Sequence, residues 1–315
     1  MSSTEKLRIL IFLTYVTGYN IKDIYALWES GYKDGLGNYD LLVEYFSLYR
    51  EGNHSILILE KLFSKADQDT DFALRYLEYQ NIKAVPFFSK DYPQSLRILK
   101  DCPPILYYKG KLKKERLVAV IGTRNVSRHA ERVTSKIIEL LISEGFGIVS
   151  GLALGVDSIA HHKSLDNNGY TLSVLPNSLE TVYPKENLKL ANSILKKGGA
   201  LVSELVFGIN RGKKSFVERD RIQAAFAEAV IPIEMGIKSG TMHTVNFAKS
   251  QKKCLYLLKP AQIMEPLSQY EGIVHLIDQQ QKNPKPNIFI IENMVDLQEK
   301  IYLLKHRPTD QFKLF

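Results

Sequence analysis

The stretch GFGIVSGLALGVDSIAHH, residues 145–162, decides the fold. A short apolar run, Phe146–Val149, ends in Ser150-Gly151, and a helical pattern follows with Gly155 and Asp157 in its first turns. A buried strand that turns directly into a helix in this way is typical of a parallel sheet. Glycine lets the backbone approach a ligand closely, and a helix N-terminus supplies unpaired N–H donors. The stretch therefore predicts backbone N–H groups that point outward at an anion.

Apolar runs and helical patterns alternate over most of the chain after residue 105. The runs are Leu117–Ile121, Phe146–Val149, Thr171–Leu175, Ala200–Val202, Ala229–Ile233 and Cys254–Leu257. Helical patterns lie between them, for instance over Ala130–Ser143 and Glu186–Lys197. This alternation predicts an α/β fold with a parallel sheet and helices on both of its faces.

The segments on either side of this region have a different pattern. Residues 1–85 predict a small helical domain, with helices over Leu41–Tyr49 and Ile56–Phe63 and a later helix capped by Thr70 or Asp71. After a polar linker, the last residues predict one strand and a short helix. We therefore expect a helical domain at 1–85, an α/β domain at 86–280 and a short extension at 281–315.

Composition limits the class of protein and of partner. The 315 residues carry a formal net charge of +8, which favours a polyanionic ligand only weakly. Cys102 and Cys254 are far apart, so they predict neither a disulfide framework nor a zinc site and fit a reducing cytoplasm. The apolar run Ile9–Val16 is too short to span a bilayer. We expect a cytoplasmic protein that does not enter a membrane.

Three loops share one predicted position, because each follows the end of a parallel strand. They are Gly122–Ser127, Ser150–Asp157 and Glu234–Thr244. Each combines glycine with hydroxyl residues, and plain helix capping would explain any one of them. Together at one sheet edge, with Arg124 in the first and Lys238 in the third, they favour an anion pocket. The phosphate-loop and dinucleotide fingerprints are both absent, which disfavours ATP hydrolysis and NAD chemistry, and we expect no cofactor.

A basic segment, RGKKSFVERDRIQAAFAEA at residues 211–229, adds candidate ligands for the same pocket. Arg219 and Arg221 stand just before a helix that we expect to begin near Ile222, and guanidinium groups suit phosphodiesters and bases. A solvated charged face is the alternative. His161 and His162 lack partners at metal-ligand spacing and predict a pair on a helix surface. No nucleophile–base pair is evident, so we expect no catalysis.

Several segments together carry a resemblance to a known family. They are YPQSLRILKDCPPILYYKG, VAVIGTRNVS, IVSGLALGVDSIAHHKSL, VLPNSLETVYPKENLKLANSI, GGALVSE, FVERDRI and SGTMHTVNFA, between about Tyr92 and Leu258. The chain resembles the DNA-processing protein A family, also called Smf, of bacterial recombination mediators. The resemblance implies an extended Rossmann-like domain and a SAM-like helical N-terminal domain. It also implies single-stranded DNA binding in a basic pocket, homodimers, protection of incoming strands during transformation, and help in loading the RecA recombinase.

The resemblance also assigns binding residues by position. Gly122, Thr123 and Arg124 match the family's G-[ST]-R; Ser150, Gly151 and Asp157 match its S-G…D loop; Arg219 and Arg221 match its R-N-R; Ser239, Gly240 and Thr241 match its later S-G loop. Lys238, next to that last loop, completes the predicted set of DNA-binding residues.

Departures from the family pattern leave other functions open. Leu154 stands where the family usually has Arg, Asp220 replaces the Asn between the two arginines, and Pro176–Glu180 replaces a Gly-containing segment. Fewer positive charges should weaken strand binding. The C-terminal tail also lacks the pattern of a winged helix. These features fit a divergent member that senses a nucleotide or binds a toxin or defence partner in a phage-defence or toxin–antitoxin module.

A hydrolase is the third alternative. The related cytokinin-activating hydrolases cleave nucleoside monophosphates with a Glu that follows the Thr of the corresponding loop. No Glu follows Thr241 in this chain, although Glu204 or Glu234 could substitute for it. The sequence therefore favours a DNA-binding protein over this enzyme.

Overall fold

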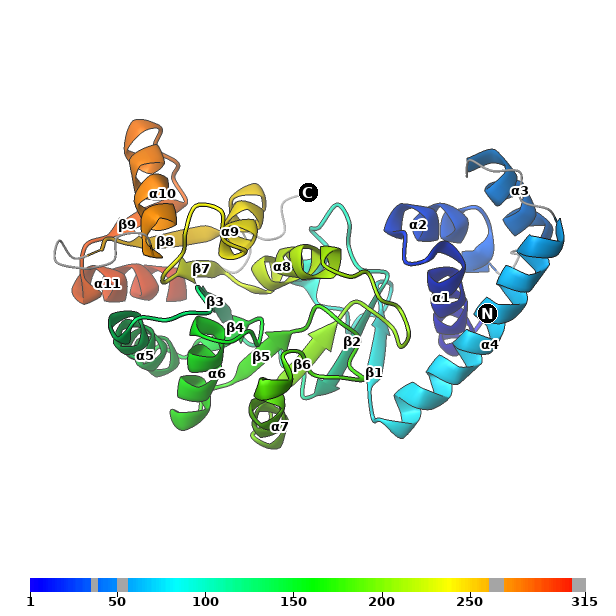
Figure 1. Ribbon diagram of the computed structural model, residues 1–315, viewed down its shortest axis with the longest axis horizontal. Helices are drawn as coiled ribbons and strands as arrows, with labels where there is room; N and C mark the ends of the chain where they lie inside the picture. Colours follow the sequence, from blue (N-terminus) through cyan, green and yellow to red (C-terminus); the bar gives the residue numbers. More distant parts are fainter. Residues whose placement is uncertain (35–38, 50–55, 261–268, 308–315) are drawn as a thin grey trace. The chain divides into compact units, whose positions relative to one another are not determined.

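The computed structural model describes residues 1–34, 39–49, 56–260 and 269–307 and divides the chain into two compact units (Figure 1). The first unit comprises Met1–Lys109 with Ser178–Glu180 and Ser203–Asn210. The second comprises Gly110–Asn177, Thr181–Val202 and Arg211–Phe315. The division predicted from sequence, at residues 85 and 280, stays a prediction.

The first unit is mainly helical, as the sequence pattern predicts. Its elements are α1 (Ser3–Thr17), α2 (Ile21–Glu29), η1 (Tyr32–Asp34), α3 (Tyr39–Tyr49), α4 (Ile56–Tyr79), β1 (Lys83–Pro86), η2 (Gln94–Leu96) and β2 (Ile105–Gly110). Helix α1 begins at a capping box, in which the Ser2 hydroxyl accepts from Glu5 N and the Glu5 carboxylate accepts from Ser2 N. The apolar sides of these helices, with β1 and β2, form one core.

The predicted N-cap at Thr70 or Asp71 is wrong, because α4 runs without interruption through both residues. The hydroxyl of Thr70 donates to the carbonyl of Ala66 inside the helix, at 2.6 Å. Asp71 and Asp67 both accept from Arg8 of α1, at 3.0 and 2.7 Å. Polar residues that resemble a cap in sequence therefore face a neighbouring helix, a contact that local pattern does not reveal.

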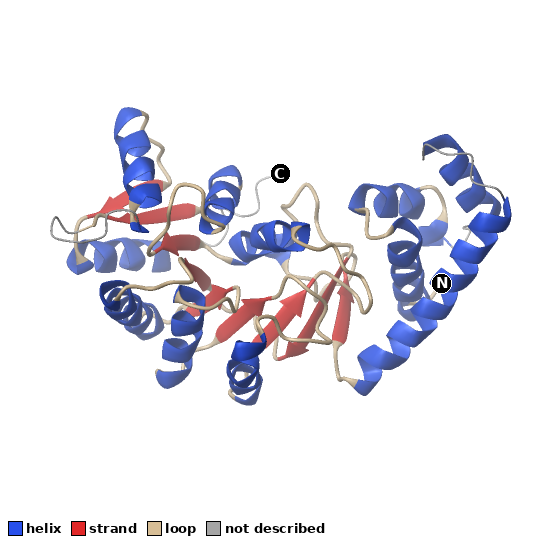
Figure 2. Cartoon of the chain, viewed as in Figure 1, coloured by secondary structure: helices blue, strands red, loops and turns tan. Residues whose placement is uncertain are grey.

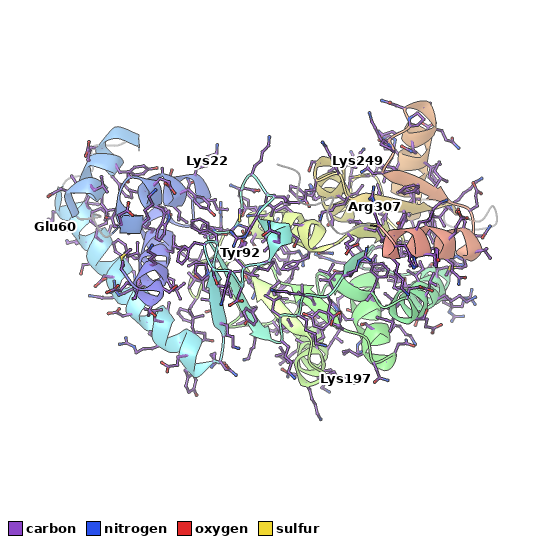
Figure 3. The ribbon with its side chains drawn as sticks, turned by 180° about the vertical axis from the view of Figure 1, so that it is seen from behind. Lys22, Glu60, Tyr92, Lys197, Lys249 and Arg307 are labelled. Atoms are coloured by element: carbon purple, nitrogen blue, oxygen red, sulfur yellow. The ribbon has the colours of Figure 1, made fainter. Side chains whose placement is uncertain are left out.

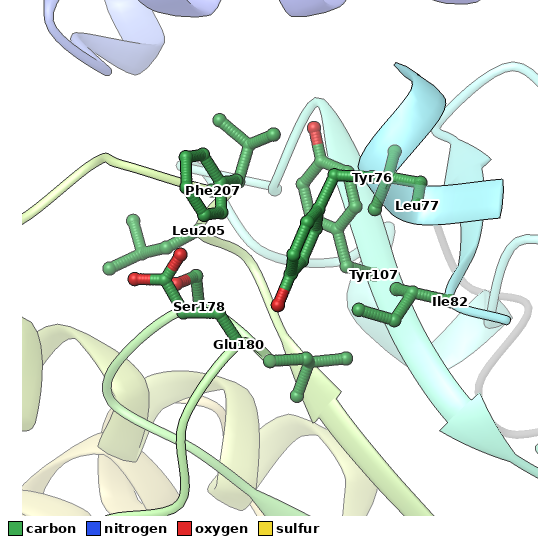
Figure 4. A pocket seen from close by; sticks show the side chains of 10 residues that line it. Tyr76, Leu77, Ile82, Tyr107, Ser178, Glu180, Leu205 and Phe207 are labelled. Carbon is green, nitrogen blue, oxygen red and sulfur yellow. The ribbon is translucent and has the colours of Figure 1, made fainter. Parts of the chain in front are cut away.

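Strand β1 is not predicted, since three of its four residues lie within the segment expected to be helical. It pairs antiparallel with β2, with Val85 opposite Leu106. Beside this hairpin, a small cavity is lined by Tyr76, Tyr107 and Phe207 among others (Figure 4). Its volume of about 10 Å³ is enough for about one water molecule. This unit is thus closely packed.

The second unit is an α/β domain. Its elements are β3 (Leu117–Ile121), α5 (Arg128–Ser143), β4 (Gly147–Ser150), α6 (Val156–Asp166), β5 (Thr171–Val174), η3 (Lys185–Asn187), α7 (Leu188–Lys196), β6 (Ala200–Ser203), α8 (Lys214–Phe226), β7 (Ala229–Pro232), α9 (Thr241–Ser250), β8 (Cys254–Leu258), α10 (Glu271–Lys282), β9 (Ile288–Ile291) and α11 (Met294–Lys305). The strands lie in the order β6-β5-β4-β3-β7-β8-β9, and every neighbouring pair is parallel. The predicted strands and their parallel sheet are confirmed.

Helices cover both faces of this sheet, as expected (Figures 1 and 2). Helices α5, α6 and α11 pack on one face around Val118 and Val120 of β3, whose five residues are all buried. Helices α8, α9 and α10 contact the strands on the other face. A fully buried apolar strand is typical of the centre of a parallel sheet, which is why its bounds are readable from sequence. The fold is therefore Rossmann-like.

The residues after 281 form a strand and a short helix, as their pattern predicts. Strand β9 pairs with β8, so this segment extends the sheet of the second unit. Arg116, just before β3, donates to the carbonyls of Leu304 and Lys305 at the C-terminal end of α11. Among the described residues, no helix has the length and apolar character needed to cross a membrane.

Candidate functional site

The three glycine-containing loops meet at the C-terminal edge of the second unit's sheet, because β4, β3 and β7 are neighbours in it. Val156 N donates to Thr123 O at 3.1 Å and joins the second loop to the first. The Thr241 hydroxyl donates to Gly122 O at 3.1 Å and joins the third loop to the first. The order of strands reverses at β3 and β7, where open α/β sheets bind ligands.

Gly155 makes the close contact between the first two loops possible. Its φ of 82° lies in the left-handed region, and a Cβ atom there would collide with the carbonyls of Thr123 and Arg124. Only glycine fits this conformation and this gap without strain. The glycine therefore holds two loops together and faces no ligand directly.

Two backbone N–H groups of the second loop point inward, which corrects the expectation drawn from residues 145–162 for these two donors. Gly151 N and Ala153 N both donate to the carboxylate of Asp157, at 3.1 and 3.3 Å. Burial raises the pKa of Asp157 to about 6, and the nearby positive charge of Arg219 opposes that rise. Asp157 thus accepts hydrogen bonds within its own loop and does not line the pocket described below.

A second buried carboxylate plays the same part in the first loop. Glu234 is fully buried and accepts from Ser127 N at 3.1 Å and from the Ser127 hydroxyl at 2.5 Å. Its own carbonyl accepts from Thr123 N at 2.8 Å. Two protein carboxylates therefore occupy donors that, in a dinucleotide-binding fold, would hold a pyrophosphate. Gly151 N, Ala153 N and Ser127 N are therefore already bonded within the protein, which favours side chains as phosphate ligands next to the first two loops.

A pocket of about 360 Å³ opens next to these loops, within the second unit. It is lined by Arg124, Gly151, Ala153, Leu154, Pro176, Tyr183, Pro184, Lys185, Glu186, Phe216 and Arg219. Three residues of the predicted set, Arg124, Gly151 and Arg219, are among them. Arg124 and Lys185 are exposed, so their positive charges are available to a ligand. The volume is in the range of small-molecule sites and matches a single nucleotide better than a duplex.

Arg219 forms one wall of the pocket and is held in place. Its Nη1 atom donates to Gly151 O at 2.8 Å and to Val174 O at 2.6 Å, and its Nε atom donates to Asp220 at 3.0 Å. A Cβ atom on Gly151 would collide with this guanidinium group. Glycine at that position therefore gives Arg219 the room to lie flat against the loop.

The prediction that a helix begins near Ile222 is wrong, since α8 begins at Lys214. Arg221 therefore lies inside the helix, is 3% exposed and donates to Glu218 O at 2.8 Å. Arg221 does not line the pocket. The segment was misassigned because its run of charged residues has no apolar periodicity, although buried arginines supply part of the helix's inner face.

The remaining predicted residues lie at the same sheet edge but outside the pocket lining. The hydroxyl of fully buried Ser150 donates to Val120 O at 2.8 Å, which ties β4 to β3. Lys238 and Gly240 are exposed in the third loop. The hydroxyl oxygen of Ser239 is buried and has no hydrogen-bond partner among the described residues. The structure brings the three loops together but only the first two into the pocket.

Comparison with known proteins gives the family. The model of the family described as DNA recombination-mediator protein A matches residues 83–292. The chain belongs to this family. Protein Smf of Escherichia coli is 32% identical over 255 residues, which are 80% of this chain and 67% of that protein.

Two solved structures of the family share the fold. DNA processing protein A of Streptococcus pneumoniae superposes with a TM-score of 0.71 at 26% identity, over 92% of this chain and 95% of that one. DNA processing protein A of Helicobacter pylori superposes with a TM-score of 0.61 at 28% identity, over 70% of this chain and 96% of that one. That second structure was solved for its mode of binding single-stranded DNA.

Two departures from the family pattern have different positions in the site. Leu154 lines the pocket and is 42% exposed, so it presents an apolar side chain to the pocket. Asp220 is 8% exposed and lies behind Arg219, outside the lining. Burial raises the pKa of Asp220, and the charge of Arg219 opposes the rise. The Asp220 charge is thus paired with Arg219 and is not presented to a ligand.

The sequence reasoning missed the aromatic part of the pocket. Tyr183 and Phe216 lie edge to face, with ring centroids 5.2 Å apart and planes at 78°. Tyr183 is 47% exposed, and Lys185 follows it at the pocket rim. The sequence YPKEN, residues 183–187, combines an aromatic residue with a lysine and could have indicated this part of the pocket. In the sequence analysis it supports only the family resemblance.

The prediction of a surface histidine pair is wrong for His161. This residue is fully buried, and its Nδ1 atom hydrogen-bonds the Thr171 hydroxyl at 2.7 Å. Burial lowers the pKa of His161 to about 3, so the imidazole is neutral. His162 is exposed, as expected. No group of three or more His, Cys, Asp or Glu among the described residues could hold a metal ion.

Proposed function

We propose that this chain binds single-stranded DNA as a recombination mediator and does not cleave it. The observation that carries the proposal is the pairing of cations with aromatic rings in one pocket. Arg124, Lys185 and Arg219 line the same pocket as the Tyr183–Phe216 pair. Proteins that bind single-stranded DNA typically combine positive charges along the sugar-phosphate backbone with aromatic rings on which the bases stack.

The pocket's size and its exposed aromatic ring favour a single strand over a duplex. A base can reach Tyr183 only when it is unstacked and unpaired, and a duplex would have to expend energy to release one. The phosphate groups would be bound by side chains, since Asp157 and Glu234 occupy the loop N–H groups. Binding is therefore expected to tolerate any sequence and to weaken steeply with salt.

The family supports finer expectations, which we include in the proposal. The relative from Helicobacter pylori binds single-stranded DNA. By the same resemblance, we expect a cytoplasmic homodimer that protects incoming strands and helps RecA to load on them. We assign Gly122, Thr123, Arg124, Ser150, Gly151, Asp157, Arg219, Arg221, Lys238, Ser239, Gly240 and Thr241 to the binding edge. Arg124 and Arg219 make direct contacts, and the others position the loops.

Sensing of a free nucleotide is the second candidate function, and the pocket volume favours it. A cavity of about 360 Å³ suits one nucleotide, and Leu154 adds an apolar contact where relatives carry charge. Such a protein would act with a toxin or defence partner. The hydrolase has less support, because Glu234 is buried against Ser127 and Glu204 accepts from Tyr19 in the first unit. Neither carboxylate lines the pocket.

Fluorescence anisotropy with a labelled oligo-dT, its duplex form and competing mononucleotides tests the proposal. We expect the single strand to bind more tightly than the duplex and to lose affinity as salt rises. Tyr183→Ala and Phe216→Ala should each weaken binding about 5- to 150-fold, from about 1–3 kcal/mol of stacking per base. Tyr302→Ala, which removes a ring 54% exposed on α11, is the matched control and should bind normally.

Two results would change the conclusion. If the unaltered chain binds a mononucleotide tightly and oligo-dT no better, the pocket serves nucleotide sensing. If strand binding persists in the Tyr183 and Phe216 variants as well as in Arg124→Ala, the binding site lies elsewhere on the surface.

A further inference from the structure

Helix α7 carries a row of lysines that begins at the rim of the pocket. Lys185 lines the pocket in η3, three residues before α7 begins, and Lys189 and Lys196 follow within the helix. All three side chains are exposed. The helix is part of the second unit and lies on the same side of the sheet as α5 and α6 (Figure 1).

The periodicity of α7 places these lysines on one face. Leu190, Ala191 and Ile194 are buried and define the inner side of the helix. At 100° per residue, Lys189 and Lys196 fall almost opposite that side, and Lys185 extends the row toward the pocket. The row therefore runs along the outermost line of the helix.

One acidic residue, Glu186, lies beside this row: it follows Lys185 in η3 and lines the pocket, and the three lysines outnumber it. Helix α7 contains no acidic residue, and none of the three lysines makes an ion pair or side-chain hydrogen bond with the described residues. On the adjacent α6, Asp166 is already paired with Lys163 at 3.9 Å. Lys197, labelled in Figure 3, donates to Leu165 O at 2.7 Å and marks the end of the row. Other surface helices, such as α10 with Asp278 and Lys282 at 2.9 Å, carry opposite charges that pair.

We propose that a strand held in the pocket leaves it along the outer face of α7, with its phosphates against Lys189 and Lys196. The inference rests on the proposed function and adds the direction in which the strand leaves the pocket and the number of nucleotides that α7 contacts. From Lys185 to Lys196 the helix rises roughly 16 Å, at about 1.5 Å per residue. A stacked strand at about 3.4 Å per nucleotide would place about five nucleotides along it.

The test compares Lys189→Gln/Lys196→Gln with a control that loses the same charge elsewhere, Lys136→Gln/Lys282→Gln on α5 and α10. Anisotropy is measured with oligo-dT of about 2 and about 15 nucleotides across a salt series, because a dinucleotide in the pocket is too short to follow α7. Each phosphate contact contributes about 0.7 to the slope of log affinity against log salt, or about fivefold at 0.1 M. The α7 variant should therefore lose about 1.4 of slope and about 25-fold in affinity for the long strand. Its loss for the short strand should be much smaller.

The outcomes separate this inference from the proposed function. An α7 variant that keeps the salt slope of the unaltered chain, or that loses as much as the control does, overturns the α7 path. Strand binding that still depends on Arg124 in that case leaves the proposed function intact. Failure of the unaltered chain to bind any single strand overturns both.

A second measurement needs no variant. Acetylation of surface lysines is followed by mass spectrometry with and without the long oligo-dT. We expect Lys189 and Lys196 to be protected by the strand while Lys136 and Lys282 react as before. Equal reactivity of all four with and without the strand would contradict the proposed path.

Discussion

Arg219 is expected to hold the pocket together as well as to contact a ligand, so Arg219→Ala should destabilise the protein strongly. The substitution removes the donor to Gly151 O and Val174 O and leaves Asp220, 8% exposed, without its cation. Breaking a buried pair by removing one partner costs about 3–5 kcal/mol. We expect a loss of that size in the free energy of unfolding at pH 7.5.

The loss should depend on pH in a defined direction. Burial raises the pKa of Asp220 and Arg219 opposes that rise, so the pKa rises further once the arginine is gone. A carboxyl group whose pKa is raised by folding destabilises the folded state as pH increases from its unfolded value near 3.9. The deficit of Arg219→Ala should therefore shrink as the pH falls from 7.5 toward 5. Adding Asp220→Asn should remove much of it at pH 7.5.

Urea unfolding followed by circular dichroism is the suitable assay, because the only tryptophan, Trp28, lies in the first unit. Arg124→Ala serves as the control, since that side chain is exposed and its loss should change stability by less than about 0.5 kcal/mol. The reasoning would be refuted by a deficit below about 1 kcal/mol for Arg219→Ala at pH 7.5. A deficit that Asp220→Asn leaves unchanged would refute the assigned role of the orphaned carboxylate.

Three further predictions concern single side chains. Arg124→Ala should weaken oligo-dT binding about 10- to 100-fold at low salt, measured by anisotropy. The midpoint of urea unfolding should stay unchanged, and a shifted midpoint would mean that Arg124 has a structural role. Gly155→Ala should lower the free energy of unfolding in urea by more than about 2 kcal/mol, because the new Cβ atom collides with backbone at a residue that also has a positive φ. Gly18 has a φ of 61° but open space around it, so Gly18→Ala should cost only about 1 kcal/mol. Equal costs for the two variants would contradict the collision at Gly155. Burial lowers the pKa of His161 to about 3, so stability should be lost as pH falls from about 6.5, by up to about 1.4 kcal/mol per pH unit. His161→Gln should reduce that loss between pH 6.5 and 4 while His162→Gln leaves it unchanged, and an identical pH profile in His161→Gln and the unaltered chain would exclude a neutral buried imidazole.

The sheet could be predicted closely from sequence because its central strands are buried on both faces. The apolar run Leu117–Ile121 is identical with β3. The other runs differ from their strands by one residue at one end, except Phe146–Val149, which is shifted by one residue from β4 at both ends. Edge elements were harder to predict. β1 is short and half exposed, so its pattern merges with that of the helix before it.

The candidate site could be predicted only as far as strand order allowed. The C-terminal edge of the sheet and the presence of Arg124 followed from loops after parallel strands, and Arg219 followed from the basic segment at residues 211–229. The roles of Asp157 and Glu234 did not, because they depend on hydrogen bonds that form only when separate loops meet. The Tyr183–Phe216 pair was hidden for the same reason, since its two rings come from distant parts of the chain.

The two buried carboxylates, Asp157 and Glu234, act as permanent competitors for the N–H groups of the first two loops. Being covalently tethered, each is present at an effective concentration of about millimolar or higher, above that of many free ligands. A soluble nucleotide that relied on those N–H groups would first have to displace a built-in anion. A DNA strand need not compete at all, because it can bind through many weak side-chain contacts spread along its length. Competition for Gly151 N, Ala153 N and Ser127 N therefore opposes a small phosphate that needs them and leaves a polymer bound by side chains unaffected.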